Sequence, residues 1–243
     1  MYIKLEKRRF VHQNIPYSFI WNKIHHKTKY SQIASNREEL NNLKDHFKRV
    51  SKGLIPNHLF NSRDLPRISQ FKIKGIKSAF IRSFSKNLIR SGKISYYGPE
   101  SKLPKYAQKV FENYKENRIN GAPGHEPILK NILIKDSSSI AIEVPIWNEA
   151  HNKVITGHID LLQVDDDEIK VIDYKPEGNF LISLPQVAMY GYLLKSKLNL
   201  TKLKCISFNK DEAWEYDPMI LTFDIKDYLI SHQIDKRPWE NFL

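Results

Sequence analysis

The stretch that decides the predicted fold covers residues 157–175, G-H-I-D-L-L-Q-V-D-D-D-E-I-K-V-I-D-Y-K. It contains parts of two runs rich in Ile, Val and Leu, 154–164 and 168–174, separated by Asp165-Asp166-Asp167. Such apolar, β-branched runs favour strands, and clustered Asp residues favour a turn between them. We therefore expect a β-hairpin in which Asp166 and Asp167 form the turn and residue 165 faces residue 168.

This register gathers polar side chains at the end of the hairpin away from the turn. Asp160 falls opposite Asp173, and His158 falls opposite Lys175, all on one face because side chains alternate along a strand. Near the turn the same face is apolar. The other face carries Ile159, Leu161, Ile172 and Tyr174.

The facing carboxylates of Asp160 and Asp173 are costly for folding alone. Opposed Cβ atoms lie about 4.5–5.5 Å apart, where like charges destabilise a sheet. At an effective dielectric constant of about 20 the repulsion is on the order of 3 kcal/mol. A divalent cation between the two oxygen ligands would remove that cost, and Lys175 would then be placed to hold a water or steady a phosphate. The alternative is a surface hairpin with a solvated, charged end.

The segments G-H-I-D (157–160), V-I-D-Y-K (171–175) and Q-V-A-M-Y (186–190) resemble the P-D-(D/E)-x-K nucleases, and within them the RecB-like branch. The resemblance covers roughly residues 105–210. It implies that Asp160 and Asp173 bind Mg²⁺ or Mn²⁺ and that Lys175 activates water. It also implies that Gln186 and Tyr190, on one face of a helix, pack beside the site and contact the nucleic-acid backbone.

Three further residues complete the expected metal-binding set. The resemblance implies a histidine on a helix before the sheet, and His125 in G-A-P-G-H-E-P-I-L has that place in the chain. Tyr174, between Asp173 and Lys175, is included in the same set. Glu143 lies in the alternating run 139–147, on the face opposite its Ile and Val residues, so we expect it near the metal; a solvent-facing strand residue is the alternative.

The order of the expected elements predicts an α/β fold with a mixed central sheet flanked by helices and a basic, mainly helical N-terminal lobe. The resemblance implies that the sheet and its helices form a restriction-endonuclease-like core. We divide the chain into a nucleic-acid-binding region, 1–103, and a nuclease core, 104–243. Periodicity predicts helices over 36–53, 76–90, 104–118 and 182–197, and a helix or turn over 125–132. Strands are expected over 139–147, in the hairpin, and over 203–208 and 219–223.

Charge is distributed unevenly between the two halves of the chain. Residues 1–110 contain 24 Lys and Arg against 6 Asp and Glu, whereas residues 111–243 contain 15 against 21. A basic region joined to an acidic one suits a protein that binds a polyanion and cuts it at metal-bound carboxylates. We expect nucleic acid as the partner, DNA ahead of RNA, with single strands or ends as targets. Compositional drift is the alternative.

Composition excludes several classes of protein. Mean hydropathy is −0.51 and no apolar run approaches 18 residues, so we expect no membrane partner. No signal-peptide pattern is present, and we expect an intracellular protein, cytoplasmic or nucleoid-associated, although the basic N-terminal thirty residues leave an organellar address open. The single cysteine, Cys205, is expected in the core and argues against disulfides and against a four-cysteine iron–sulfur cluster.

Together these observations predict a Mg²⁺- or Mn²⁺-dependent nuclease that hydrolyses DNA phosphodiester bonds, exonuclease-like by its resemblance to the RecB branch. Two alternatives stay open. One is an endonuclease specific for a sequence or a branched structure, and the other is a nucleic-acid-binding module without catalytic activity.

Overall fold

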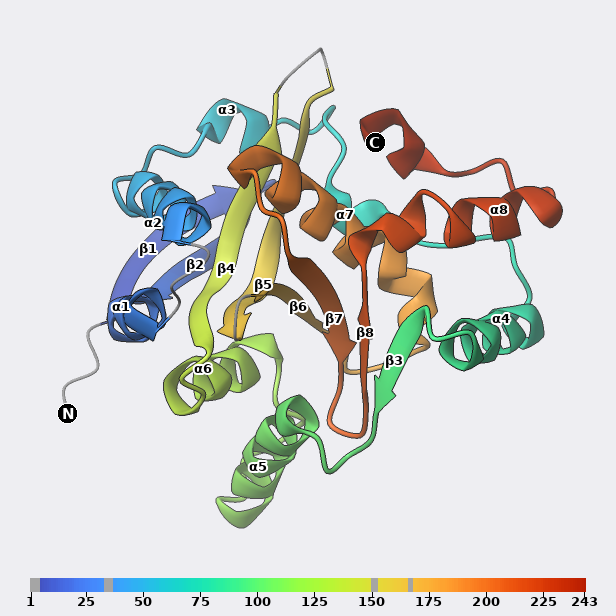
Figure 1. The fold of residues 1–243 in the computed structure, drawn as a ribbon. Helices are drawn as coiled ribbons and strands as arrows, with labels where there is room; N and C mark the ends of the chain where they lie inside the picture. The colour runs from blue at the N-terminus through green and yellow to red at the C-terminus, as the bar shows by residue number, and fades with distance from the viewer. Residues whose placement is uncertain (1–4, 33–36, 150–152, 166–167) are drawn as a thin grey trace.

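The computed structural model describes residues 5–32, 37–149, 153–165 and 168–243, which fold around one sheet (Figure 1). Its eight strands follow the order β1-β2-β4-β5-β6-β7-β8-β3. The pairing of β6 with β7 is parallel and the other pairings are antiparallel. The strands are β1 (Leu5–His12), β2 (Ile15–Asn22), β3 (Ile94–Tyr97), β4 (Ser139–Asn148), β5 (Ile155–Asp165), β6 (Glu168–Tyr174), β7 (Leu203–Phe208) and β8 (Ala213–Tyr216). The predicted α/β class with a mixed sheet is confirmed.

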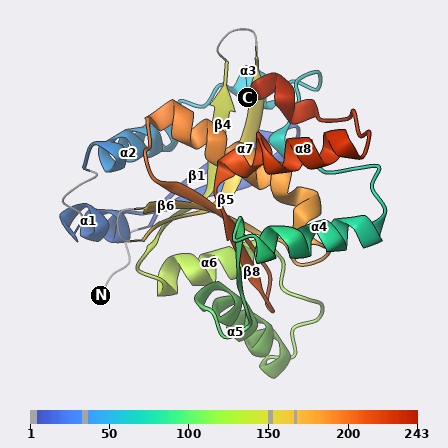
Figure 2. The same cartoon turned by 45° about the vertical axis from the view of Figure 1, so that its right-hand side comes forward.

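Helices cover both faces of this sheet (Figure 2). On one face α7 packs across the strands with α2, α4 and α8 around it, and on the other lie α5 and α6. The α-helices are α1 (Lys23–Gln32), α2 (Arg37–Ser51), α3 (Asn57–Phe60), α4 (Ser78–Arg90), α5 (Lys102–Glu116), α6 (His125–Lys135), α7 (Phe180–Leu198) and α8 (Asp224–Ser231). The short 3-10 helices are η1 (Ile68–Gln70), η2 (Pro218–Leu221) and η3 (Pro238–Phe242). The predicted long helices are therefore present, with ends shifted by a few residues.

The β5–β6 hairpin has the predicted register near its turn. Cross-strand pairs run from Asp165 with Glu168 to Leu161 with Ile172. The two expected turn residues, 166 and 167, lie outside the described residues.

Beyond Leu161 the two strands diverge, so the expected ladder pairs at the far end are not formed. β6 continues along β7, where Asp173 pairs with Ser207 rather than with Asp160. The Asp160 carboxylate instead accepts a hydrogen bond from the main-chain N–H of Tyr174 (3.0 Å). The prediction that Asp160 and Asp173 are direct cross-strand partners is therefore wrong, because β7 and not β5 fixes the end of β6.

Both β4 and β5 change faces at the level of Glu143. Its φ of 50° is left-handed, a conformation that a residue with a side chain adopts at a cost of about 1–3 kcal/mol. Ile142 and Val144 consequently belong to different hydrophobic clusters, and so do Leu161 and Ile159 of the neighbouring strand. The expectation that Ile159 and Leu161 share a face is thus wrong, since the kink rotates both strands.

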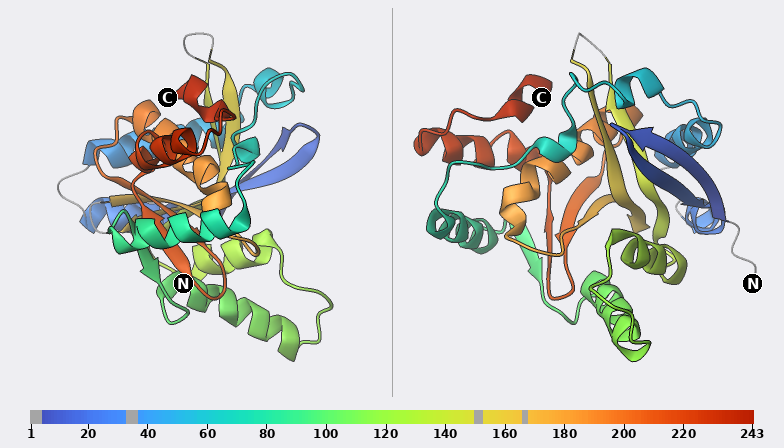
Figure 3. Two further views of the ribbon diagram at one scale, coloured as in Figure 1. Left: turned by 90° about the vertical axis from the view of Figure 1, so that its right-hand side faces the viewer. Right: turned by 180° about the vertical axis from the view of Figure 1, so that it is seen from behind.

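The N-terminal residues differ from the expected helical region. β1 and β2 form a hairpin at the edge of the sheet (Figure 3), and helices follow only from α1 onwards. Gln13 and Asn14 both have positive φ, 48° and 68°, as a two-residue hairpin turn requires. Gln13 is not a typical turn residue, which is why the sequence pattern did not reveal the hairpin. The division of the chain at residue 103 stays a prediction.

The strand expected over 219–223 is also wrong. This segment begins with η2, where Pro218 occupies the first turn and the Asp217 side chain accepts a hydrogen bond from the N–H of Met219 (2.9 Å). A capped proline turn uses the main-chain groups that a strand would need for pairing. The short strands β3 and β8 were not predicted.

None of the helices in the described part of the chain is long and apolar enough to cross a membrane.

Candidate metal centre

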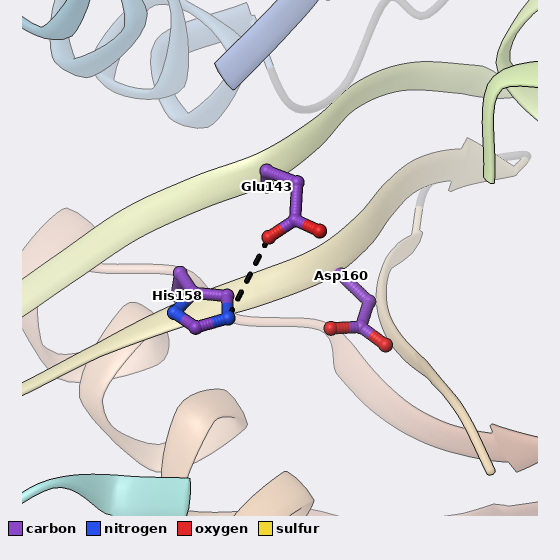
Figure 4. Close-up of side chains that lie close together, drawn as sticks. All are labelled: Glu143, His158 and Asp160. Atoms are coloured by element: carbon purple, nitrogen blue, oxygen red, sulfur yellow. Dashed lines mark ion pairs between the residues drawn. The ribbon is translucent and has the colours of Figure 1, made fainter. Parts of the chain in front are cut away.

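Glu143, His158 and Asp160 converge where β4 and β5 change faces (Figure 4). Glu143 reaches across from β4 to the His158 ring, and Asp160 lies two residues further along β5. The Glu143 Oε2 and His158 Nε2 atoms are 3.5 Å apart, and one donor atom from each of the three residues lies within 4.8 Å of the others. Neighbouring and opposite ligands of an octahedral cation with bonds of about 2.1 Å are about 3.0 and 4.2 Å apart. Small side-chain adjustments would therefore let the three groups bind one ion.

The electrostatics of this group favour a cation. Burial, followed by repulsion from Asp160 and Asp173, raises the pKa of Glu143 to about 9. Burial also raises the pKa of Asp160 and holds that of His158 well below its ordinary value. Glu143 Oε2 and His158 Nδ1 are buried, and neither has a hydrogen-bond partner in the described part of the chain. A bound divalent cation would compensate the carboxylates and return them to their ionised form.

A second group adjoins the first through Asp160. Lys175 Nζ lies 2.6 Å from Asp173 Oδ2 and donates a hydrogen bond to Gln186 Oε1 (3.2 Å). The Gln186 amide nitrogen in turn donates to Asp173 Oδ1 (3.3 Å) and lies 3.4 Å from the hydroxyl of Tyr190, one turn further along α7. Gln186 therefore fixes the Lys175–Asp173 pair from the helix side.

Burial and the neighbouring charges together set the ionisation of this second group. Asp173 is fully buried, and burial, followed by the Asp160 carboxylate, raises its pKa to about 7 although Lys175 opposes the shift. Burial alone would lower the pKa of Lys175, but the carboxylates of Asp173 and Asp160 outweigh it, so the pKa is raised and the ammonium form is favoured.

His125 and Tyr174 meet at the same end of the sheet. His125 is the first residue of α6, and its Nε2 lies 2.9 Å from the Tyr174 carbonyl oxygen. Because a carbonyl oxygen only accepts, the His125 ring donates this hydrogen bond, and Nε2 would bind an ion only after losing its proton. The Tyr174 side chain points into the smaller hydrophobic cluster, and burial raises its pKa to about 12. Tyr174 therefore offers its main chain, and not its phenol, to the site.

A cavity of about 250 Å³ opens onto the metal-binding group. Tyr17 of β2, His125 and Glu126 of α6, and Glu143 of β4 are among its lining residues. The Tyr17 ring lies against the His158 ring with centroids 3.9 Å apart. The cavity therefore gives a small polar group access to Glu143 and His125.

Gly157 allows α7 and η1 to pack closely against β5. A Cβ atom at this position would lie 2.6 Å from Cε1 of Tyr190 and 3.0 Å from Cδ1 of Ile68. Tyr190 of α7 and η1 can therefore pack onto β5 only because residue 157 has no side chain. This is the physical reason for the glycine in the G-H-I-D segment.

The structure thus brings the sequence-predicted residues into two adjoining groups. Asp160 and Glu143 lie with His158, which was not among the predicted ligands although the expected register placed it at the same end of the hairpin as Asp160. Asp173, Lys175, Gln186 and Tyr190 form the second group, and His125 and Tyr174 meet beside it. Tyr17 was missed because only the unpredicted β1–β2 hairpin brings it here.

The chain matches no protein-family model, and no curated protein matches its sequence. The function must therefore be argued from the site itself.

Proposed function

We propose that this protein is a divalent-metal-dependent nuclease that hydrolyses phosphodiester bonds in DNA. The observation that carries the proposal is the shared position of Asp160. Its carboxylate belongs to the Glu143–His158 group and, through the Tyr174 N–H, adjoins the Lys175–Asp173 pair. Carboxylates suited to a cation and a partly buried lysine beside them are the groups that metal-assisted phosphodiester hydrolysis needs.

Each group has a defined task in that reaction. Glu143, His158 and Asp160 would hold a divalent cation, with Asp173 and the Tyr174 carbonyl beside them, and that cation would polarise the phosphate and lower the pKa of water. The Lys175 ammonium donates hydrogen bonds to the attacking water or to a phosphate oxygen. Gln186 keeps the Lys175 side chain in place. One water is consumed: its oxygen bonds to phosphorus, the phosphorus–sugar oxygen bond breaks, and the leaving oxygen takes up a proton.

A second cavity supports nucleic acid as the substrate. It has a volume of about 480 Å³ and lies between β2, α1 and α2. Five lysines line it, Lys23, Lys27, Lys44, Lys48 and Lys52, together with Trp21 and Tyr30. Amines bind phosphates, and aromatic rings stack on bases. Trp21 is four residues from Tyr17 on β2, about 13 Å, so one strand leads from this cavity to the metal centre.

Mg²⁺ and Mn²⁺ are the proposed cofactors because most of the donor atoms are oxygens. Zn²⁺ also binds imidazole and carboxylates, so the His158 ring makes it the ion to exclude by experiment. The likeness to RecB-like nucleases favours cleavage from an end of the strand over cleavage within it.

The proposal is tested by incubating the protein with linear, circular, single-stranded and double-stranded DNA, each with EDTA, Mg²⁺, Mn²⁺ or Zn²⁺. We expect degradation of linear DNA with Mg²⁺ or Mn²⁺ and none in EDTA. Cleavage of circular DNA would point to an endonuclease. Tight DNA binding with no cleavage under any metal would show that the protein is a binding module.

A further inference from the structure

We infer that Arg67 is the phosphate-binding residue of this site, holding a phosphate group of the substrate beside the metal centre. The inference rests on the proposed function for the identity of the anion, but the evidence for an anion site is separate from it. Arg67 is 9% exposed, and its guanidinium forms no ion pair with a carboxylate of the described residues. Its Nε is buried without a hydrogen-bond partner.

The main chain fixes Arg67 close to the metal-binding group. Residue 67 pairs in parallel with Thr156 of β5, two residues before His158, and the Pro66 carbonyl accepts a long hydrogen bond from the Thr156 N–H (3.5 Å). The next residue, Ile68, packs against Gly157. The segment that carries Arg67 therefore lies along the edge of β5 that β6 leaves open.

The side chain of Arg67 points to the same place. Its Nη2 donates a hydrogen bond to the Tyr17 hydroxyl (3.3 Å), and the Tyr17 ring lies against the ring of His158. His12 is nearby, with its ring centroid 5.8 Å from that of His158 and its Nδ1 buried without a partner. The positive charge of Arg67 contributes to the lowered pKa of both histidines, after burial in each case.

Arg67 is therefore surrounded by a hydroxyl and imidazole rings, and two ring nitrogens, Nδ1 of His12 and Nδ1 of His158, have no hydrogen-bond partner in the described part of the chain. A buried cation without an anion lowers the stability of a fold by several kcal/mol, and folding alone therefore gives no reason for Arg67 at this position. A phosphate supplies the missing negative charge, and the planar guanidinium can donate two parallel hydrogen bonds to it. Tyr17, the hydrogen-bond partner of Arg67, lines the cavity that opens onto Glu143. A DNA strand with one phosphate at Arg67 would therefore have its neighbouring phosphodiester bonds at the metal centre.

The first test uses no cleavage. Melting temperatures of wild type and Arg67→Gln are compared in EDTA with and without inorganic phosphate, with Arg63→Gln, an exposed arginine four residues earlier, as the matched control. We expect Arg67→Gln without phosphate to melt at or above the wild-type temperature, because an unpaired buried charge is removed. Phosphate should raise the melting temperature of wild type and Arg63→Gln by about 3 °C or more, and that of Arg67→Gln by less than about 1 °C.

A purely structural role for Arg67 predicts different results. If its only task is the hydrogen bond to Tyr17, both Arg67→Gln and Tyr17→Phe destabilise the protein in EDTA, and the response to phosphate is unchanged. That outcome, or no response of the wild type to phosphate, overturns the inference. If Arg67→Gln does not fold, Arg67→Lys decides: it keeps the charge but cannot donate two parallel hydrogen bonds, so we expect it to lose most of the response to phosphate, and a full response would contradict the inference.

Oligonucleotides with a 5′-phosphate, a 3′-phosphate or hydroxyl ends show which phosphate is bound. If wild type in EDTA binds one phosphorylated end more tightly and Arg67→Gln has lost that preference, Arg67 binds the terminal phosphate of a DNA strand. If Arg67→Gln binds all three oligonucleotides more weakly by the same factor, Arg67 binds an internal phosphodiester. In cleavage, Arg67→Gln should raise KM about tenfold or more and change kcat little. If Arg67→Gln cleaves DNA with an unchanged KM and an unchanged response to phosphate, the inference about Arg67 is overturned and the nuclease proposal still stands. If phosphate binding depends on Arg67 but the wild type cleaves no DNA, the inference stands and the nuclease proposal is overturned.

Discussion

The two ends of the β5–β6 hairpin are built differently although they belong to the same pair of strands. Near the turn five cross-strand pairs form in regular register, and apolar side chains such as Leu162 and Val171 are fully buried. At the other end the strands diverge, and the buried side chains are ionisable, among them Asp160 and Asp173. The turn end satisfies the requirements of folding. The open end carries buried ionisable groups that folding alone does not explain. We therefore expect the turn end of the hairpin to determine stability and the open end to determine activity.

The largest expected effect is on activity, at the open end. Lys175→Ala removes the ammonium group that lies between Asp173 and Gln186. We expect cleavage to fall on the order of 10³-fold, equivalent to about 4 kcal/mol of transition-state stabilisation, with DNA binding within a few-fold of wild type. Lys170→Ala is the control, because Lys170 is the lysine of β6 near the turn. A clean Lys175→Ala preparation that cuts DNA at the wild-type rate would contradict the assignment.

At the turn end the expected effect is on stability. Leu162 is fully buried, so Leu162→Ala should lower the free energy of unfolding by about 2–5 kcal/mol, as other large-to-small core changes do. Urea unfolding measures the loss. Cleavage per folded molecule, assayed well below the melting temperature, should stay within a few-fold of wild type. If activity fell while the protein remained folded, the two ends of the hairpin would not be separate in function.

A smaller effect is expected on the pH dependence of stability without metal. The pKa of Glu143 is raised to about 9 from an ordinary value of 4.5, mainly by burial, so the folded protein holds a proton that the unfolded chain has lost. This contribution is fully present below about pH 4.5 and is lost as pH rises towards 9, with a slope of at most about 1.4 kcal/mol per pH unit.

Glu143→Gln keeps the shape of the side chain and removes this titration. Chemical unfolding in EDTA between pH 5 and 9 should therefore give a shallower decline for Glu143→Gln than for wild type. Asp173, with a pKa of about 7, contributes to the decline in both proteins. Parallel curves for the two proteins would show that Glu143 is ionised in the folded state without a metal.

The sequence predicted those features that depend on the spacing of residues within one helix or one hairpin. Apolar alternation and the acidic turn predicted the hairpin register, and helical spacing predicted α7 with Gln186 next to Tyr190. The divergence of the hairpin was not predictable, because it depends on the parallel pairing of β6 with β7 and on the segment at Arg67 that lies along β5.

The parts of the candidate site that were missed come from distant segments. Tyr17 contacts His158, 141 positions further along the chain, and Arg67 pairs with Thr156, 89 positions further along, so neither contact leaves a local pattern in the sequence. His158 is the exception: the expected register already placed it with Asp160 at the end of the hairpin away from the turn, so the sequence contained a signal for this ligand although regular alternation of faces fails there.

The most direct test of the account is the thermal stability of Asp160→Asn with and without metal, beside wild type and the exposed control Asp235→Asn. Asp160 is buried near Glu143 and Asp173, so its neutralisation in EDTA should leave the melting temperature unchanged or raise it. Saturating Mn²⁺ or Mg²⁺ should stabilise wild type and Asp235→Asn, by about 2.7 kcal/mol at a metal concentration one hundred times Kd, and Asp160→Asn much less. Loss of stability in EDTA together with full stabilisation by metal and undiminished cleavage in Asp160→Asn would show that the carboxylate is structural and would contradict the proposed metal centre.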